Sequence, residues 1–473
     1  MKRLLPLLVV LALAVPALAT PWDNYYVHVA AKTPAERTVA ANLGMDIFAA
    51  QSDGIVGLAS QKQIEGLIVR GLDVTYLALP EHAPGAAADF PSGDSQFHNY
   101  VEMVTLLQQW AADYPDLLHL YSIGQSLQGR ELWTVKISDN VQTDESAAEA
   151  GFIVMGQHHA REHISREVPL GFIQYLLETY DVLYSTTRLV DSTEIWVTPT
   201  VNPDGAEFDI STGSYVWQRK NMRDYPASCF GVDINRNYGY QWGGDGSSSD
   251  ECDETYRGAS AFSEPETQHV RDHVSAHPNT TILVSYHNYD ELVLYPWGYT
   301  TGQIPHADLV RHQTLAQAYA NLTGYTAEQS SSLYTTSGDT TDWAYGALGI
   351  TSFTVELYPD SYSYIGFYVP GNQIQDVIDA NLPAIVYMLS NANTLKEGRA
   401  AVGLDQILAD VAEYKSWKTQ ASPAPARHAA ERDLACGVLS VSSESQPLWG
   451  PLVIAAALLV PALVFLIRRR NRR

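Results

Sequence analysis

The feature that most constrains the fold is a long alternation of strand-like and helix-like segments between residues 97 and 392. It opens with a predicted helix at residues 100–114 and two predicted strands at 118–123 and 132–137. Short apolar runs typical of buried strands follow at residues 152–155, 194–198, 281–286 and 352–356. Helical spacing of apolar residues recurs between them, at residues 168–180, 264–277, 307–322 and 374–390. This alternation predicts an α/β domain with a mixed, mostly parallel central sheet that helices cover on both faces.

The segment before this domain contains two smaller parts. Residues 1–19 have two basic residues, an apolar core and a small-residue end, which predicts a signal peptide and export. Residues 21–80 predict a small α/β domain, with a helix from Pro34 that Thr33 caps and Glu36 completes as a capping box. The Pro- and Ala-rich residues 81–96 predict a linker.

The segment after the domain predicts attachment to a membrane. Residues 393–447 are rich in Ala, Pro and charged side chains and predict a stalk. Residues 448–467 are apolar and about long enough to cross a bilayer, and residues 468–473 carry the arginines expected on the cytoplasmic side. We expect an exported protein, outside the cell, at its surface or in the periplasm, anchored by this helix unless a sorting protease removes it.

Composition restricts the partners and the redox environment. The formal net charge of −24 argues against nucleic acid, because phosphate binding needs basic patches. There are three cysteines, of which Cys229 and Cys252 lie in one loop-rich region and could pair. Cys436 is left as a free thiol or a processing feature.

A polar cluster at residues 156–162 follows the predicted strand at 152–155. His159 and Glu162 are three residues apart and could face the same way, and both residue types bind zinc. Alone, this pair fits a solvated helix start equally well, so a metal site requires a third ligand and a catalytic group elsewhere.

Two residues at the ends of later predicted strands supply these parts. His287 could complete a site with three protein ligands and one open position, where zinc lowers the pKa of water to about 7. Glu356 follows an apolar run, where a carboxylate is costly unless it has a partner or a role. It could act as the general base for that water.

With these residues in place, the chain resembles zinc metallocarboxypeptidases of the pancreatic carboxypeptidase A/B type over residues 97–392. The matching motifs are residues 159–162, 202–205 and 233–237, followed by His287, Tyr334 and Glu356. The resemblance implies one zinc ion per catalytic domain and removal of C-terminal residues from peptides or proteins by a monomeric enzyme.

The resemblance also implies roles for residues around the zinc ligands. Asn235 and Arg236 would bind the terminal carboxylate, which arginine can hold bidentately. Tyr334 would close over the substrate, and Arg219 would stabilise the oxyanion. Arg161 and Tyr289 would contact the substrate. Asp233 would orient His159 through its free ring nitrogen; the alternative for Asp233 is that it caps a turn.

Three further expectations follow from the resemblance. His158 and His163 match no ligand position and are expected to be solvated or structural. Cys229 and Cys252 fall where animal members carry a disulfide. Residues 21–80 resemble a pro-domain that shields the cleft until the linker is cut.

Substrate preference depends on two residues that map to the floor of the pocket for the C-terminal side chain. Thr341 stands where A-type enzymes have an apolar residue and B-type enzymes an aspartate, and Asp339 stands where both have a small residue. We expect Asp339 to admit Lys and Arg and Thr341 to leave room for apolar side chains. The alternative is that Asp339 caps a turn and the pocket is hydrophobic.

Two other functions are compatible with parts of the pattern. One is an amidase or endopeptidase of the same fold that acts on cell-wall peptides. The other is a non-catalytic peptide-binding module at the cell surface. The exopeptidase is favoured over the amidase or endopeptidase by the presence of Asn235, Arg236 and Tyr334. The non-catalytic module is disfavoured by the complete catalytic set, His159, Glu162, His287 and Glu356.

Overall fold

The computed structural model describes residues 24–78, 89–225, 229–360, 366–398 and 402–419. The predicted signal peptide, membrane segment and basic tail lie outside these ranges. Among the described residues, none of the helices is both long and apolar enough to span a bilayer.

An eight-stranded mixed sheet forms the centre of the catalytic domain, with strand order β11-β10-β12-β9-β7-β8-β6-β5. The strands are β5 (Leu118–Gln125), β6 (Glu131–Ile137), β7 (Ala150–Gly156), β8 (Thr193–Thr198), β9 (Thr280–Asp290), β10 (Leu292–Tyr295), β11 (Thr326–Gln329) and β12 (Thr351–Asp360). The middle strands β12, β9, β7 and β8 pair in parallel, whereas β6 pairs antiparallel with both β8 and β5. The predicted mixed sheet is therefore confirmed.

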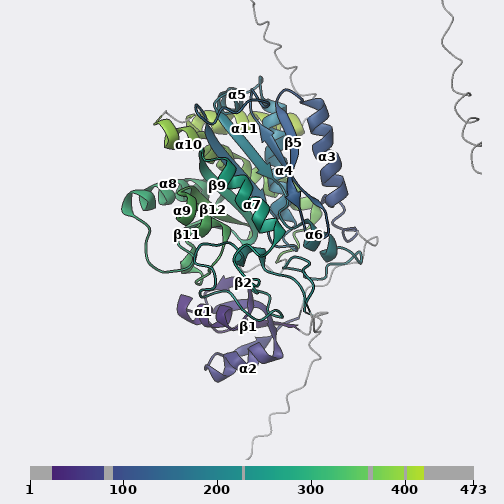
Figure 1. Cartoon of the computed structure of the whole chain (residues 1–473), viewed down its shortest axis with the longest axis vertical. Coiled ribbons are helices and arrows are strands. Elements are labelled where there is room, and N and C mark those ends of the chain that lie inside the picture. Colours follow the sequence, from purple (N-terminus) through teal and green to yellow (C-terminus); the bar gives the residue numbers. More distant parts are fainter. Residues whose placement is uncertain (1–23, 79–88, 226–228, 361–365, 399–401, 420–473) are drawn as a thin grey trace, which may run out of the picture. The chain divides into compact units, whose positions relative to one another are not determined.

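Helices cover both faces of this sheet, as predicted (Figure 1). Phe152 and Val154 of β7 belong to the core formed with α4 (Ile164–Thr179), α8 (His306–Thr323) and α10 (Ile374–Glu397). Ile153 and Met155 belong to the opposite core with α7 (Pro265–Ala276) and α9 (Thr340–Leu348). Alternate side chains of a strand point to opposite faces, so a continuous apolar run is what a strand buried on both sides requires.

The catalytic domain extends beyond both of its predicted ends. Residues 89–96 were expected to belong to the linker, but Phe90 is buried and Asp94 accepts hydrogen bonds from Tyr215 Oη (2.9 Å) and Gly371 N (2.9 Å). At the other end, α10 continues to Glu397, and α11 (Leu404–Thr419) buries Ile407, Val411 and Tyr414. The prediction of a stalk from residue 393 is therefore wrong for α11, whose apolar residues recur at helical spacing within a charged segment.

Further helices precede or connect these elements: α3 (Tyr100–Asp113), α5 (Tyr184–Val190) and α6 (Pro203–Asp209). Asn202 caps α6 by accepting a hydrogen bond from Gly205 N (3.1 Å), and Pro203 occupies the first turn. This explains the turn motif at residues 202–205 as a local structure.

The N-terminal α/β domain is a four-stranded antiparallel sheet with two helices. Its elements are β1 (Asn24–Val29), α1 (Pro34–Asn42), β2 (Asp46–Gln51), β3 (Gly54–Ser60), α2 (Gln61–Val69) and β4 (Val74–Tyr76), with strand order β2-β3-β1-β4. The capping box of Thr33 and Glu36 is present at the start of α1. A core of its own, including Val27, Ile55 and Leu67, holds this domain together.

Candidate active site

The central parallel strands bring the separated sequence motifs together at one edge of the sheet. Gly156, the last residue of β7, pairs with Tyr286 of β9, and His287 pairs with Glu356 of β12. The residues that follow β7 therefore lie beside His287 and Glu356. This is the edge at which parallel sheets place their binding sites, because the strands end there and the following loops can turn toward one another.

His159, Glu162 and His287 form a compact, buried group of metal-ligand type. Glu162 Oε1 lies 2.7 Å from His159 Nδ1, and Glu162 Oε2 lies 3.0 Å from His287 Nδ1. The two Nδ1 atoms are 3.3 Å apart. Two nitrogen ligands of a tetrahedral zinc ion, each at about 2.0–2.1 Å, would be separated by roughly 3.3–3.4 Å. The donor set and its spacing therefore fit zinc.

The outward ring nitrogens of both histidines have hydrogen-bond partners. His159 Nε2 lies 3.1 Å from Asp233 Oδ1, and His287 Nε2 lies 3.1 Å from Ser285 Oγ. Burial lowers the pKa of His287, which favours the neutral form that binds metal. Such contacts fix the orientation of each ring and leave Nδ1 for the ion.

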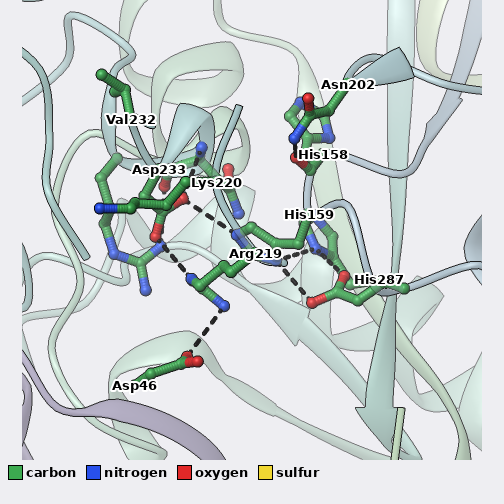
Figure 2. A network of polar contacts seen from close by, with 12 residues as sticks. Asp46, His158, His159, Asn202, Arg219, Lys220, Val232, Asp233 and His287 are labelled. Carbon is green, nitrogen blue, oxygen red and sulfur yellow. Dashed lines mark hydrogen bonds and ion pairs between the residues drawn. The ribbon is translucent and has the colours of Figure 1, made fainter. Parts of the chain in front are cut away.

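Asp233 also links the histidine to Arg219, as Figure 2 shows. Arg219 Nη2 donates to Asp233 Oδ2 at 2.8 Å. Burial alone would lower the pKa of Arg219, but the carboxylates of Asp233 and Asp46 outweigh it and raise the pKa. Asp233 Oδ1 also accepts from Asn235 N (3.0 Å), so the two roles considered for Asp233, turn cap and partner of His159, coexist.

A cavity beside this group is lined by most of the expected substrate-binding residues. Its lining includes His159, Glu162, Arg219, Asn235, Arg236, Tyr289, Tyr334, Asp339 and Glu356. Asn235 Oδ1 accepts hydrogen bonds from Thr340 N and Oγ1, both at 3.0 Å, which orients the amide. Arg236 Nε donates to Gly246 O (2.9 Å) and is held in place by it.

Glu356 has the environment expected of a group that exchanges protons. Burial, followed by the negative charges of Glu162 and Asp290, raises the pKa of Glu356 well above its usual value, against the effect of Arg219 and Arg236. A raised pKa brings a carboxylate closer to neutral pH, where general bases work best.

The two residues that were expected to set the substrate preference, Asp339 and Thr341, occupy different positions. Asp339 lines the cavity and also caps α9, with Oδ1 accepting from Asp342 N (2.7 Å) and Oδ2 accepting from Thr336 Oγ1 (3.0 Å). Thr341 is buried and its hydroxyl lies 2.6 Å from that of Thr354. Thr354, which no sequence pattern singles out, lines the cavity, whereas Thr341 does not line it and lies behind Thr354. Only the tertiary pairing of α9 with β12 reveals this.

The neighbouring histidines are structural. His158 is fully buried and contacts Tyr238 Oη (2.9 Å) and Thr340 Oγ1 (3.0 Å). His163 Nε2 lies 2.9 Å from Asp209 Oδ2. The alternative of solvated side chains is therefore wrong for both. The disulfide between Cys229 and Cys252 is present, as expected.

The N-terminal domain, which the resemblance suggested as a shield over the cleft, reaches into this site through side chains that the sequence did not single out. Asp46 Oδ2 lies 2.6 Å from Arg161 Nη1, and Asp46 Oδ1 lies 3.5 Å from Arg219 Nη1. The Arg161 guanidinium also stacks on Phe48, 4.6 Å from its ring centre. Arg161 is consequently 0% exposed. No spacing rule relates Asp46 and Phe48 to residues more than one hundred positions later, so these contacts could not be predicted from the sequence.

Further contacts join the same domain to the rim of the cavity. Asn42 Nδ2 donates to Asp245 Oδ1 (3.1 Å), and its Oδ1 accepts from Gly246 N (2.7 Å). Thr38 Oγ1 accepts from Thr335 N at 3.1 Å, next to Tyr334. Tyr334 itself packs against the apolar core of the N-terminal domain.

Comparison with known proteins agrees with this geometry. Residues 103–384 match the family model described as zinc carboxypeptidase. A zinc carboxypeptidase from Saccharothrix mutabilis subsp. capreolus is 36% identical over 405 residues, covering 80% of this chain and 91% of that protein. Carboxypeptidase A1 from Bos taurus is 34% identical over 283 residues, covering 59% and 66%.

A solved structure, carboxypeptidase A from Helicoverpa armigera, shares the fold with a TM-score of 0.67. It is 24% identical and the match covers 79% of this chain and 99% of that one. Zinc is the cofactor of the matched family, and the donor set of His159, Glu162 and His287 fits it. The chain belongs to the zinc carboxypeptidase family and is a metallocarboxypeptidase.

Proposed function

We propose that the enzyme cleaves the last peptide bond of peptides and proteins, with the terminal carboxylate bound by Asn235 and Arg236. The observation that carries this proposal is the single cavity that these two residues share with Glu162, Glu356 and Arg219. A guanidinium beside the metal ligands can bind a free carboxylate. An enzyme that requires the terminal carboxylate for binding cleaves the last peptide bond of a chain.

Each residue then has one task in the reaction. Zinc held by His159, Glu162 and His287 would acidify water and polarise the scissile carbonyl. Glu356 accepts a proton from the attacking water and passes it to the leaving amine. Arg219 donates to the oxygen that becomes negative.

The binding residues act before and during this chemistry. Tyr334 closes over the bound residue, Arg161 and Tyr289 contact the preceding part of the peptide, and Asp233 keeps His159 oriented.

Paired peptides with a free and an amidated C-terminus test the proposal. We expect release of the last residue only from the free acid, and its loss on chelation and recovery with zinc. The variant Arg236→Lys should lower kcat/KM by about 10²-fold or more, because a point charge replaces a bidentate donor. Equal cleavage of free and amidated peptides would instead favour an endopeptidase or amidase.

The substrate preference we propose includes both basic and apolar C-terminal residues. Asp339 places a carboxylate on the cavity wall, and Thr354 together with Leu294 adds a small, partly apolar surface. Because Asp339 also caps α9, replacement by alanine would confound specificity with loss of the cap.

Asp339→Asn separates the two effects, since asparagine caps helices as well as aspartate does. We expect kcat/KM for C-terminal Lys and Arg to fall about tenfold or more, and that for Phe and Leu to stay within about twofold. If kcat/KM changed equally for substrates ending in Lys and in Phe, Asp339 would act only as the cap of α9.

We further propose that the N-terminal domain keeps the enzyme latent. Asp46 forms ion pairs with Arg161 and Arg219, and Phe48 stacks on the guanidinium of Arg161. A substrate would have to displace both. Cleavage within residues 79–88 would allow the domain to leave. Full-length enzyme as active as trimmed enzyme would contradict this proposal.

Export is proposed from residues 1–19 and is supported by the disulfide, since disulfides persist in oxidising compartments. Anchoring by residues 448–467 remains a proposal from their apolar sequence and the arginines that follow. Fractionation of expressing cells, with and without residues 448–473, tests both.

A further inference from the structure

A second group of carboxylates lies at the opposite end of the sheet from the zinc ligands. Asp139 and Glu145 belong to the loop between β6 and β7, and Glu149 directly precedes β7. One carboxylate oxygen from each of the three lies within 4.8 Å of the others. β7 contains seven residues, so its length of about 3.3 Å per residue puts this group roughly 20 Å from the site at its other end.

Glu149 is buried, and among the described residues its Oε2 atom has no hydrogen-bond partner. The residue is 8% exposed, and within the described ranges Glu149 Oε2 and Asp139 Oδ1 accept no hydrogen bond. Buried carboxylate oxygens are normally satisfied by donors, by a counter-charge or by a metal ion. Among the described residues, the carboxylate of Glu145 accepts long hydrogen bonds from Asn140 Nδ2 at 3.2 Å and Ser138 Oγ at 3.4 Å.

The nearby ammonium groups are bound to other acceptors. Lys136 Nζ pairs with Glu194 Oε1 at 2.7 Å and donates to Thr143 O at 2.6 Å. Lys396 Nζ donates to the main-chain oxygens of Ser146 (2.6 Å) and Glu149 (2.5 Å). These lysines reduce the local negative charge but do not contact the free carboxylate oxygens.

The pKa values of Glu149 and Asp139 are raised, as expected for carboxyl groups that lie close together without a counter-ion. Burial, followed by the charges of Glu145, Asp139 and Glu194, raises the pKa of Glu149 to about 8. Burial and Glu145 also raise the pKa of Asp139. A bound cation would remove this repulsion.

We propose that Asp139, Glu145 and Glu149 form a binding site for a calcium ion. The ligands are all oxygen atoms, which hard cations prefer. Two oxygens on one calcium ion, each at about 2.4 Å, lie at most about 4.8 Å apart, and the three carboxylates meet this limit. Calcium also accepts the irregular geometry of a loop, whereas magnesium demands a near-ideal octahedron.

Calcium at this site joins the loop of residues 138–149 to the start of β7. Since β7 carries the zinc motif only at its far end, the ion stabilises the domain without taking part in peptide hydrolysis. The proposal does not depend on the substrate or the mechanism, so stability and binding measurements test it separately from activity.

The test uses the full-length protein with its zinc retained, freed of calcium by passage into resin-treated buffer. Calcium is then titrated by calorimetry and the melting temperature is followed, with zinc content measured throughout. We expect one calcium ion per chain and a rise in melting temperature of about 5 °C at one hundred times the Kd. Magnesium at the same concentration should give a clearly smaller rise.

Two variants and a control connect the response to these residues. Glu149→Gln and Asp139→Asn should each abolish most of the calcium response. Glu149→Gln should melt no lower than wild type without calcium, because glutamine keeps the size of the side chain and is neutral without a bound proton or cation. Glu413→Gln changes the same charge at an exposed position of α11 and should keep the full response. Absence of a calcium-dependent shift in wild type, an undiminished shift in Glu149→Gln, or an equal shift with magnesium would each overturn the proposal.

Discussion

Replacing Asp46 with asparagine should activate the full-length enzyme if the N-terminal domain keeps it latent as proposed above. Asp46 is 1% exposed and lies between Arg161 and Arg219, which we propose to contact the substrate, and its nearer contact is 2.6 Å. The substitution keeps the size of the side chain and removes its charge. The capping and apolar contacts of the N-terminal domain stay as they are, so the change isolates the electrostatic part of the interface.

The size of the effect follows from the burial of the pair. Removing one partner of a buried ion pair costs about 3–5 kcal/mol, because the other charge is left without compensation. At 1.4 kcal/mol per factor of ten, this corresponds to roughly 10²- to 4 × 10³-fold weaker binding of the N-terminal domain. Asparagine can still accept one hydrogen bond from Arg161, so we expect the lower end, about 10²-fold.

Two assays measure this effect. In the first, kcat/KM of the full-length chain is compared with that of enzyme cut within residues 79–88, and Asp46→Asn should close most of the gap. In the second, the released N-terminal fragment is added back to trimmed enzyme, and its inhibition constant should rise about 10²-fold. Asp73→Asn, an exposed position of the same domain, should change neither value.

If Asp46→Asn remained as latent as Asp73→Asn and its fragment inhibited equally well, the Asp46 charge would not hold the N-terminal domain in place. Inhibition would then arise from Phe48 and the contacts around Tyr334 alone. Circular dichroism and melting of the full-length variant show whether the N-terminal domain is still folded, so a loss of latency through unfolding is recognised.

Three further outcomes are expected. Glu356→Gln should retain its zinc, measured by atomic absorption, and lose about 10²–10⁴-fold in kcat, the usual contribution of a general base; zinc loss would place Glu356 among the ligands instead. Cys229→Ser opens a loop spanning 23 positions and should lower the free energy of unfolding by about 3 kcal/mol in urea melts, whereas an unchanged midpoint would mean that the bridge constrains little. Burial lowers the pKa of His312 to about 4, and its ring is fixed in the neutral form between Asp308 O (2.8 Å) and Ser352 N (3.3 Å). The unfolded chain binds this proton at higher pH than the folded chain does. The free energy of unfolding should therefore fall by on the order of 3 kcal/mol as the pH drops from about 6.5 to 4. In His312→Gln this decline should be shallower, and an identical pH dependence would contradict the assignment.

The site could be predicted to a large extent because its residues lie at the ends of recognisable strands. His287 and Glu356 stand where apolar runs stop, and the topology of parallel strands brings such ends together. The same reasoning could not place Thr354 in front of Thr341, since that order depends on how α9 packs against β12. It also missed α11, whose apolar residues are sparse and become buried only against α5 and α10.

The α/β class, the residues suited to zinc and the candidate proton acceptor can be inferred without a structure, because strand periodicity and residue chemistry are local properties. Tertiary structure alone decided that Asp46 contacts Arg161 and that Asp339 is at once a helix cap and part of the cavity wall. It alone also gathered Asp139, Glu145 and Glu149 into one group. These contacts join side chains whose proximity depends on how loops and domains pack, and the free energy that selects such packing is spread over the whole core rather than encoded in any short motif.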